Sequence, residues 1–159
     1  MAIESGLERG TCVSRIIKAP RRTIYRAFLD PDAIVAWLPP EDMQGRLHEF
    51  DAREGGTYRM SLTYRAASHS LPGKTSEHTD TFRARFLALV PDERIAQSIE
   101  FESTDPALLG PMTIIWTLTE VPGGTEVTVR CKNEPPEIPP SDHAAGLLSS
   151  LNNLAAFVE

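Results

Sequence analysis

The feature that most constrains this fold is a single helical stripe near the end of the chain, between Pro140 and Glu159. Its apolar residues are spaced so that 3.6 residues per turn bring them to one side of a helix. They are Leu147, Leu148, Leu151, Leu154, Ala155 and Val158. We expect Ser141 or Asp142 to cap this helix. The stretch before it, from about residue 45 to 133, lacks the helical period. A lone amphipathic helix after many strands must bury its stripe against their sheet.

Alternation of apolar and polar residues predicts six strands in that stretch. The clearest strand covers 58–64, where every second residue is apolar and the residues between are polar. The other predicted strands lie at 46–51, 78–90, 94–103, 112–119 and around 127–131. Residues 66–77 are predicted to form a long loop, and Gly123-Gly124 indicates a hairpin. The short connections favour an antiparallel sheet, because parallel strands need long crossovers.

The N-terminal part predicts one more strand and two short helices. Residues 11–18 are rich in β-branched side chains and end before Pro20, which suits the first turn of a helix. Asp30 is placed to cap a second short helix, with Pro31 at its first position. Pro39 and the proline after it end that helix. The predicted order is therefore strand, two short helices, six strands and one long helix.

Composition and charge indicate one globular domain over residues 1–159, with an ordered core at about 11–158. The net charge is −6, from 22 acidic and 16 basic residues. A basic face supplies most of the affinity for nucleic acids and anionic membranes, so we expect no nucleic-acid partner. No run of residues approaches the roughly 18 apolar positions that a membrane span needs.

Cys12 and Cys131 are too few and too far apart in the sequence for a disulfide scaffold. The N-terminus carries acidic residues and lacks the apolar segment of a secretory signal. We therefore predict reduced thiols and a cytoplasmic location. A monomer and a homodimer both remain open.

Several short strings occur in order along the chain and together carry a family resemblance. They are RIIKAP at 15–20, IYRAF at 24–28, DP at 30–31, Trp37, FDAREGGTYR at 50–59, VPDERI at 90–95, GGTEVT at 123–128 and Gly146-Leu147. This set resembles the START-like (SRPBCC) superfamily with the helix-grip fold, and within it the branch named for the activator of heat-shock-protein-90 ATPase homologues. Many members of that branch have Trp where this chain has Leu147.

The resemblance implies an α+β domain in which a seven-stranded antiparallel sheet curls around the C-terminal helix. Two short helices follow the first strand, and an apolar cavity lies between sheet and helix. Members bind lipids, sterols, polyketides or plant hormones, and some catalyse cyclisation or dehydration. Fold alone does not determine which of these activities a chain has.

Strand parity predicts the residues that would face such a cavity. Aromatic, Met and aliphatic side chains dominate the set, with His48 and Gln97 as polar members, and the resemblance adds Trp37 at the cavity mouth. The complete predicted site comprises Trp37, His48, Phe50, Tyr58, Met60, Tyr64, Phe82, Phe86, Gln97, Ile99, Phe101, Met112, Ile114, Trp116, Leu147 and Leu151. The alternative is that these residues fill a solid core, and that the polar pair bonds to neighbouring backbone.

Motifs for catalysis are weak. The histidines His48, His69, His78 and His143 show no HExxH spacing, and no GxSxG string or glycine-rich phosphate loop occurs. We therefore expect no metal and no cofactor. An acid–base pair could be drawn from a small set of residues, although no spacing singles one out. The set is His48, Glu41, Asp42, Glu49 and Tyr64.

Three functions follow from these observations. The first is binding of a small apolar or amphipathic molecule between sheet and helix, without catalysis. The second is a co-chaperone-like interaction module with heat-shock protein 90 as partner. The third is a metal-free cyclase or dehydratase that uses the same cavity.

Overall fold

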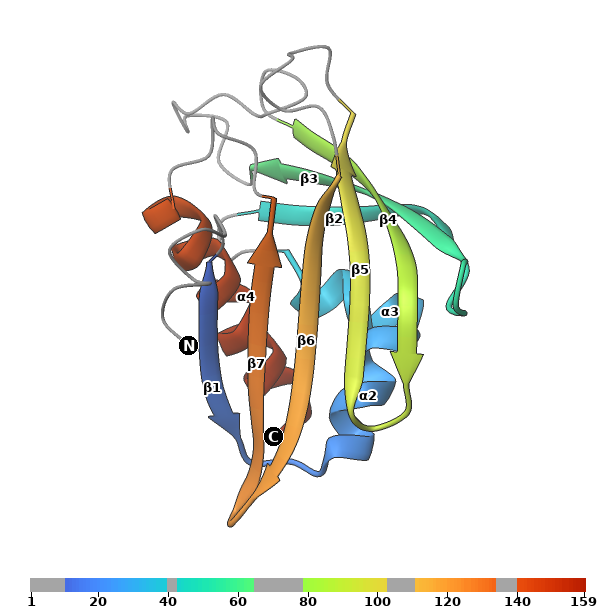
Figure 1. The fold of residues 1–159 in the computed structure, drawn as a ribbon. Helices are drawn as coiled ribbons and strands as arrows, with labels where there is room; N and C mark the ends of the chain where they lie inside the picture. The colour runs from blue at the N-terminus through green and yellow to red at the C-terminus, as the bar shows by residue number, and fades with distance from the viewer. Residues whose placement is uncertain (1–10, 40–42, 65–78, 103–110, 134–139) are drawn as a thin grey trace.

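A computed structural model of the chain describes residues 11–39, 43–64, 79–102, 111–133 and 140–159 (Figure 1). The elements follow the predicted order. They are β1 (Cys12–Ile17), α2 (Arg21–Leu29), α3 (Pro31–Trp37), β2 (Met43–Phe50), β3 (Thr57–Tyr64), β4 (Thr79–Val90), β5 (Arg94–Phe101), β6 (Met112–Val121), β7 (Gly124–Lys132) and α4 (Pro140–Val158). The predicted loop at 66–77 lies outside the described residues, as do His69 and His78.

The seven strands form one antiparallel sheet in the order β1-β7-β6-β5-β4-β3-β2. Strands β2 to β6 each pair with the next one along the chain, and β1 pairs with the other side of β7. Figure 1 shows α2, α3 and α4 on the same face of this sheet, and α4 contacts β1. The predicted α+β helix-grip architecture is confirmed.

The two short helices begin where their prolines predict. Pro20 occupies the cap position of α2, and Pro31 is the first residue of α3. The Asp30 side chain accepts a hydrogen bond from the Asp32 backbone N–H at 2.9 Å, which caps α3 as expected. Helix α3 contacts both β2 and α4, so it connects one edge strand of the sheet with the terminal helix.

The stripe of α4 faces the sheet, with one exception. Leu151 and Leu154 are fully buried, and Leu147 is also buried. Leu148 is 42% exposed, so its predicted place in the buried stripe is wrong. It follows Leu147 directly and therefore points about 100° away from it around the helix. None of the described helices combines the length and apolar character that crossing a membrane requires.

Helix α4 begins earlier than the sequence predicts. Its first residue is Pro140, so Ser141 and Asp142 lie within the first turn and not at the cap position. Proline suits this first position because its missing N–H would have no partner there. Ser141 and Asp142 are the second and third residues of the helix, so the predicted cap is wrong.

Polar residues of α4 hold it against the end of α3. Ser150 Oγ donates to the Leu38 carbonyl at 2.6 Å, and Asn153 Nδ2 donates to the Pro39 carbonyl at 2.9 Å. Carbonyls at the end of a helix have no partner within the helix, so these two bonds satisfy groups that would otherwise need water. They also determine where α4 lies relative to the short helices.

The hairpin between β6 and β7 brings the chain close to β1. Gly123 adopts a positive φ of 86°, as its place in a tight turn requires. A side chain at Gly124 would place its Cβ 2.2 Å from the Ile17 carbonyl oxygen. Glycine is therefore needed at 124 for close backbone approach, in addition to its role at the turn.

Candidate functional site

The face of the sheet that the helices cover, here called the inner face, gathers most of the predicted site residues. The buried members on the sheet are Tyr58, Met60, Phe82, Phe86, Gln97, Ile99, Met112, Ile114 and Trp116. Trp37, Leu147 and Leu151 join them from the helices, and half-buried Phe50 and Phe101 pack against the same core. Their predicted place on the inner face is confirmed, whereas contact with a ligand stays a prediction.

His48 lies on the opposite, outer face, so its predicted inward direction is wrong. The register of β2 against β3 shifts between Leu47 and Glu49, which marks a β-bulge. A bulge adds one residue and resets the alternation of the strand. Leu47 and Phe50 pack against the core, while His48 and Glu49 are both exposed.

Three aromatic rings from separate elements meet where α2 and α3 cover the sheet. Phe28, Trp37 and Trp116 pack edge to face, with ring centroids 4.8, 5.0 and 5.7 Å apart. Trp37 is only 1% exposed, and its Nε1–H donates to the Ala27 carbonyl at 2.9 Å. The expectation that Trp37 lies at a cavity mouth is therefore wrong. The predicted site does not include Phe28. Its spacing from Ile24 places both on one face of the helix and could have indicated that it is buried.

A second aromatic group lines the inner face of β2, β3 and β4. The Tyr58 ring lies 5.5 Å from Phe50, 6.1 Å from Phe82 and 5.6 Å from Phe86, measured between centroids. These side chains come from alternate positions on neighbouring strands, as the pleat of a sheet requires. The inner face therefore carries a continuous aromatic surface at this end.

Few polar side-chain atoms are buried within this apolar interior. Gln97 Nε2 donates to the Tyr58 hydroxyl oxygen at 3.3 Å. Burial raises the pKa of Tyr58 far above its ordinary value of 10.0, so the phenol stays neutral. In the part of the chain that the structure describes, Trp116 Nε1 is the buried side-chain nitrogen or oxygen without a hydrogen-bond partner.

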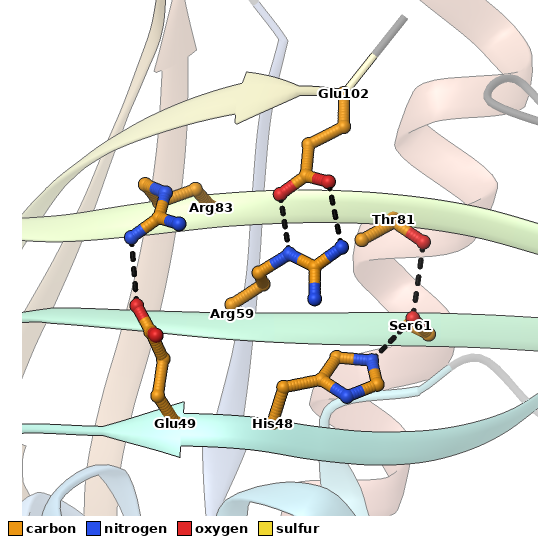
Figure 2. A network of polar contacts seen from close by, with 7 residues as sticks. All are labelled: His48, Glu49, Arg59, Ser61, Thr81, Arg83 and Glu102. Atoms are coloured by element: carbon orange, nitrogen blue, oxygen red, sulfur yellow. Dashed lines mark hydrogen bonds and ion pairs between the residues drawn. The ribbon is translucent and has the colours of Figure 1, made fainter.

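The outer face of the same strands carries a polar network. Arg59 donates two hydrogen bonds to Glu102, at 2.6 and 2.8 Å, and Arg83 donates to Glu49 at 2.7 Å (Figure 2). The hydrogen bond from Arg59 lowers the pKa of the Glu102 carboxyl. These side chains point away from the helices, so they play no part in the interior.

His48 belongs to this outer network. Its Nε2 lies 2.7 Å from Ser61 Oγ, which in turn lies 3.0 Å from Thr81 Oγ1 (Figure 2). An acid–base pair between His48 and an interior carboxylate is therefore not formed. Two other members of the predicted set, Glu41 and Asp42, lie outside the described residues.

The remaining candidates for chemistry add little. The side chain of Tyr64 lies outside the described part of the structure. Among the described residues, no group of three or more His, Cys, Asp or Glu side chains gathers as a metal ion would require. Neither cysteine forms a disulfide, with Cys12 exposed and Cys131 buried. Cys131 Sγ lies 3.9 Å from His143 Nε2, which is at most a weak sulfur contact.

A curled antiparallel sheet, two short helices and a long terminal helix over an apolar inner face define the helix-grip class of SRPBCC proteins. Sequence comparison agrees with this architecture. The chain belongs to the family described as Activator of Hsp90 ATPase homolog 1-like protein, which it matches over residues 18–159. No curated protein sequence matches the chain.

Solved structures show the same fold. A protein of Chromobacterium violaceum is 36% identical and superposes with a TM-score of 0.82, covering 94% of this chain and 96% of that one. An AHSA1-like protein of Aeromonas hydrophila is 18% identical with a TM-score of 0.70, covering 94% of this chain and 92% of that one. The second likeness concerns the fold alone.

Proposed function

We propose that the protein binds a small apolar or amphipathic molecule, of lipid or polyketide type, between the sheet and α4. The observation that carries this proposal is the make-up of the inner face. Aromatic rings and the methionines Met60 and Met112 share this buried surface with the hydrogen-bonded Tyr58–Gln97 pair. Apolar surfaces with a few convergent polar groups are typical of ligand sites, and Met side chains adapt to irregular ligand shapes.

Family membership supports the proposal without determining the ligand, because one fold hosts several functions. Neither cysteine forms a disulfide, as a reducing compartment would favour, and we place the binding activity in the cytoplasm. No catalytic step is included, since His48 lies on the outer face with its hydrogen-bond partner Ser61.

Binding is tested by native mass spectrometry and thermal shift with a mixed panel of lipids and polyketides. We expect at least one compound to give a stoichiometric mass increase and to raise the melting temperature. A panel in which no compound binds would contradict the proposal.

A matched pair of variants locates the site. Ala84 lies on the inner face between Tyr58 and Ile99, and the next residue, Arg85, is exposed on the outer face. Ala84→Leu projects extra volume toward the helices and is expected to abolish binding of the compound found in the panel. Arg85→Leu is expected to leave binding unchanged. Equal affinities for the two variants would place the ligand elsewhere.

A second candidate function rests on the family description, which names an activator of the Hsp90 ATPase. The outer face offers an ordered charged surface for a protein partner, with the Arg59–Glu102 and Arg83–Glu49 pairs. The test is an Hsp90 ATPase assay with the wild type and an Arg59→Ala/Arg83→Ala double variant. Stimulation by the wild type that the double variant loses supports this function, and absence of stimulation by the wild type rejects it.

A further inference from the structure

The two tryptophans of the chain differ in one respect that packing does not explain. Both are buried and their rings are in contact, with centroids 5.7 Å apart. The Trp37 N–H donates to the Ala27 carbonyl, whereas the buried Trp116 Nε1 has no partner among the described residues. A buried donor without an acceptor is costly, and such groups are rare in folded proteins. The Trp116 N–H is therefore a buried donor that could bind an acceptor.

Trp116 is a neighbour of the interior polar pair in the sheet register. In the β5–β6 register, Trp116 is opposite Ile95, and Gln97 is opposite Ile114. Trp116 and Gln97 are thus diagonal neighbours on the inner face, a relation in which long side chains reach one another. Gln97 in turn donates to the Tyr58 hydroxyl. Trp116, Gln97 and Tyr58 are therefore neighbouring residues on the inner face, and we call these three residues the polar patch.

The charge of this patch restricts the ligand that it could accept. Within the described residues, the buried polar side chains are Thr11, Gln97, Thr125 and Ser150, and none of them carries a charge. Thr125 and Ser150 already donate to the carbonyls of Ala19 and Leu38. A ligand carboxylate would therefore enter the interior without a compensating cation, which is strongly unfavourable. A neutral acceptor, such as a ketone or ester oxygen, meets no such penalty.

We propose that Trp116 determines specificity by donating its indole N–H to the oxygen of a neutral, carbonyl-bearing apolar ligand. This proposal rests on the function proposed above and names the ligand class for the same site. The carbonyl oxygen lies at the patch formed by Trp116, Gln97 and Tyr58. The hydrocarbon part of the ligand lies against the aromatic and Met side chains of the inner face.

The test compares three probes that differ only at one end, 2-nonanone, nonane and nonanoate, at pH 7. The protein is labelled with ¹⁵N, so its two tryptophans give two indole N–H signals. Trp37→Phe removes one of the two signals, and the signal that remains belongs to Trp116. We expect 2-nonanone to move the Trp116 signal downfield and to bind about fivefold to tenfold more tightly than nonane. Nonanoate is expected to bind more weakly than 2-nonanone.

Variants of β6 provide the second readout. Trp116→Phe keeps an aromatic ring but removes the N–H, and it is expected to bring the affinities for 2-nonanone and nonane to within about twofold. Thr117→Val changes the exposed neighbour on the outer face and should preserve the preference. If Trp116→Phe does not fold, the shift of the wild-type indole signal still decides the question.

The outcomes separate this inference from the function on which it rests. Equal binding of 2-nonanone and nonane, or a Trp116 signal that does not move on saturation, overturns the role of Trp116 while ligand binding stands. A water cross-peak at the Trp116 N–H that persists at saturating 2-nonanone also overturns it, because water is then the acceptor. If no probe binds and the lipid and polyketide panel also fails, the proposed function itself is rejected.

Discussion

The two faces of strands β2 to β5 both carry paired polar groups, but in very different environments. On the inner face, Gln97 and Tyr58 have one hydrogen bond between them in an apolar environment. On the outer face, Arg59 and Glu102 are about one-third exposed and form a bidentate pair in contact with water. Water screens and replaces the outer contacts but not the inner ones. Changes of similar chemistry should therefore have large effects inside and small effects outside.

The largest effect is expected from truncating a buried residue of β4, with the exposed residue that follows it as the control. Phe86 is fully buried and Leu87 is 49% exposed. Phe86→Ala should lower the free energy of unfolding by about 3–5 kcal/mol, because it removes a ring and leaves a cavity. Leu87→Ala should change it by less than about 0.5 kcal/mol. Urea denaturation measures both values, and similar values for the two would show that the faces are assigned wrongly.

An intermediate effect is expected for the inner polar pair. Tyr58→Phe removes the acceptor of Gln97 and should lower the free energy of unfolding by about 1–3 kcal/mol. Adding Gln97→Leu replaces both partners by apolar groups and should recover most of that loss. The double-mutant cycle is measured by chemical denaturation. If the double variant loses more free energy of unfolding than the two single variants together, this interpretation is contradicted. The interpretation requires that one unpaired partner destabilises the fold more than the absence of both.

A smaller effect is expected for the outer ion pair. Arg59→Met removes the contact with Glu102 and should lower the free energy of unfolding by at most about 1 kcal/mol, since both side chains are partly solvated. The difference from wild type should shrink in high salt, which screens surface charges. Met60→Ala, at the next residue on the inner face, is the control and should show no such salt dependence. A loss at Arg59 that salt does not change would mean that the pair acts through packing.

The smallest effect is the pH dependence of the same pair. Arg59 holds the pKa of Glu102 below its ordinary value of 4.5, so the folded state favours the charged carboxylate. Its contribution to stability is present above about that value and is lost as the pH falls through the folded-state pKa. Glu102→Gln should therefore be less stable than wild type at pH 7, with a difference that disappears in acid. Urea unfolding from pH 7 to pH 3 measures it, and a difference that grows in acid would reverse the assignment.

Much of this site could be predicted from the alternation of residues along the strands. The errors of that prediction have local causes. The alternation of Tyr58 and Met60 with polar neighbours predicted the inner face correctly, because successive side chains of a strand point to opposite sides. The prediction from alternation failed for His48 because a β-bulge resets the alternation of β2. No residue type in this strand indicates the bulge. Leu148 was misplaced because it lies about 100° around the helix from Leu147, at the edge of the stripe, where spacing alone does not separate buried from exposed positions. Ala155 has the same relation to Leu154 and is buried.

The order of strands and helices follows from the amino-acid sequence alone, as does the division of most residues between core and surface. Those properties depend on short-range periods of two and 3.6 residues, which are visible in any stretch of the chain. The hydrogen-bond partners of the polar groups, in contrast, depend on the folded chain. Ser150 meets the Leu38 carbonyl and Gln97 meets Tyr58, whereas Trp116 has an unpaired N–H. Hydrogen bonds need contact within about 3 Å, and only the folded chain brings groups so distant in sequence together.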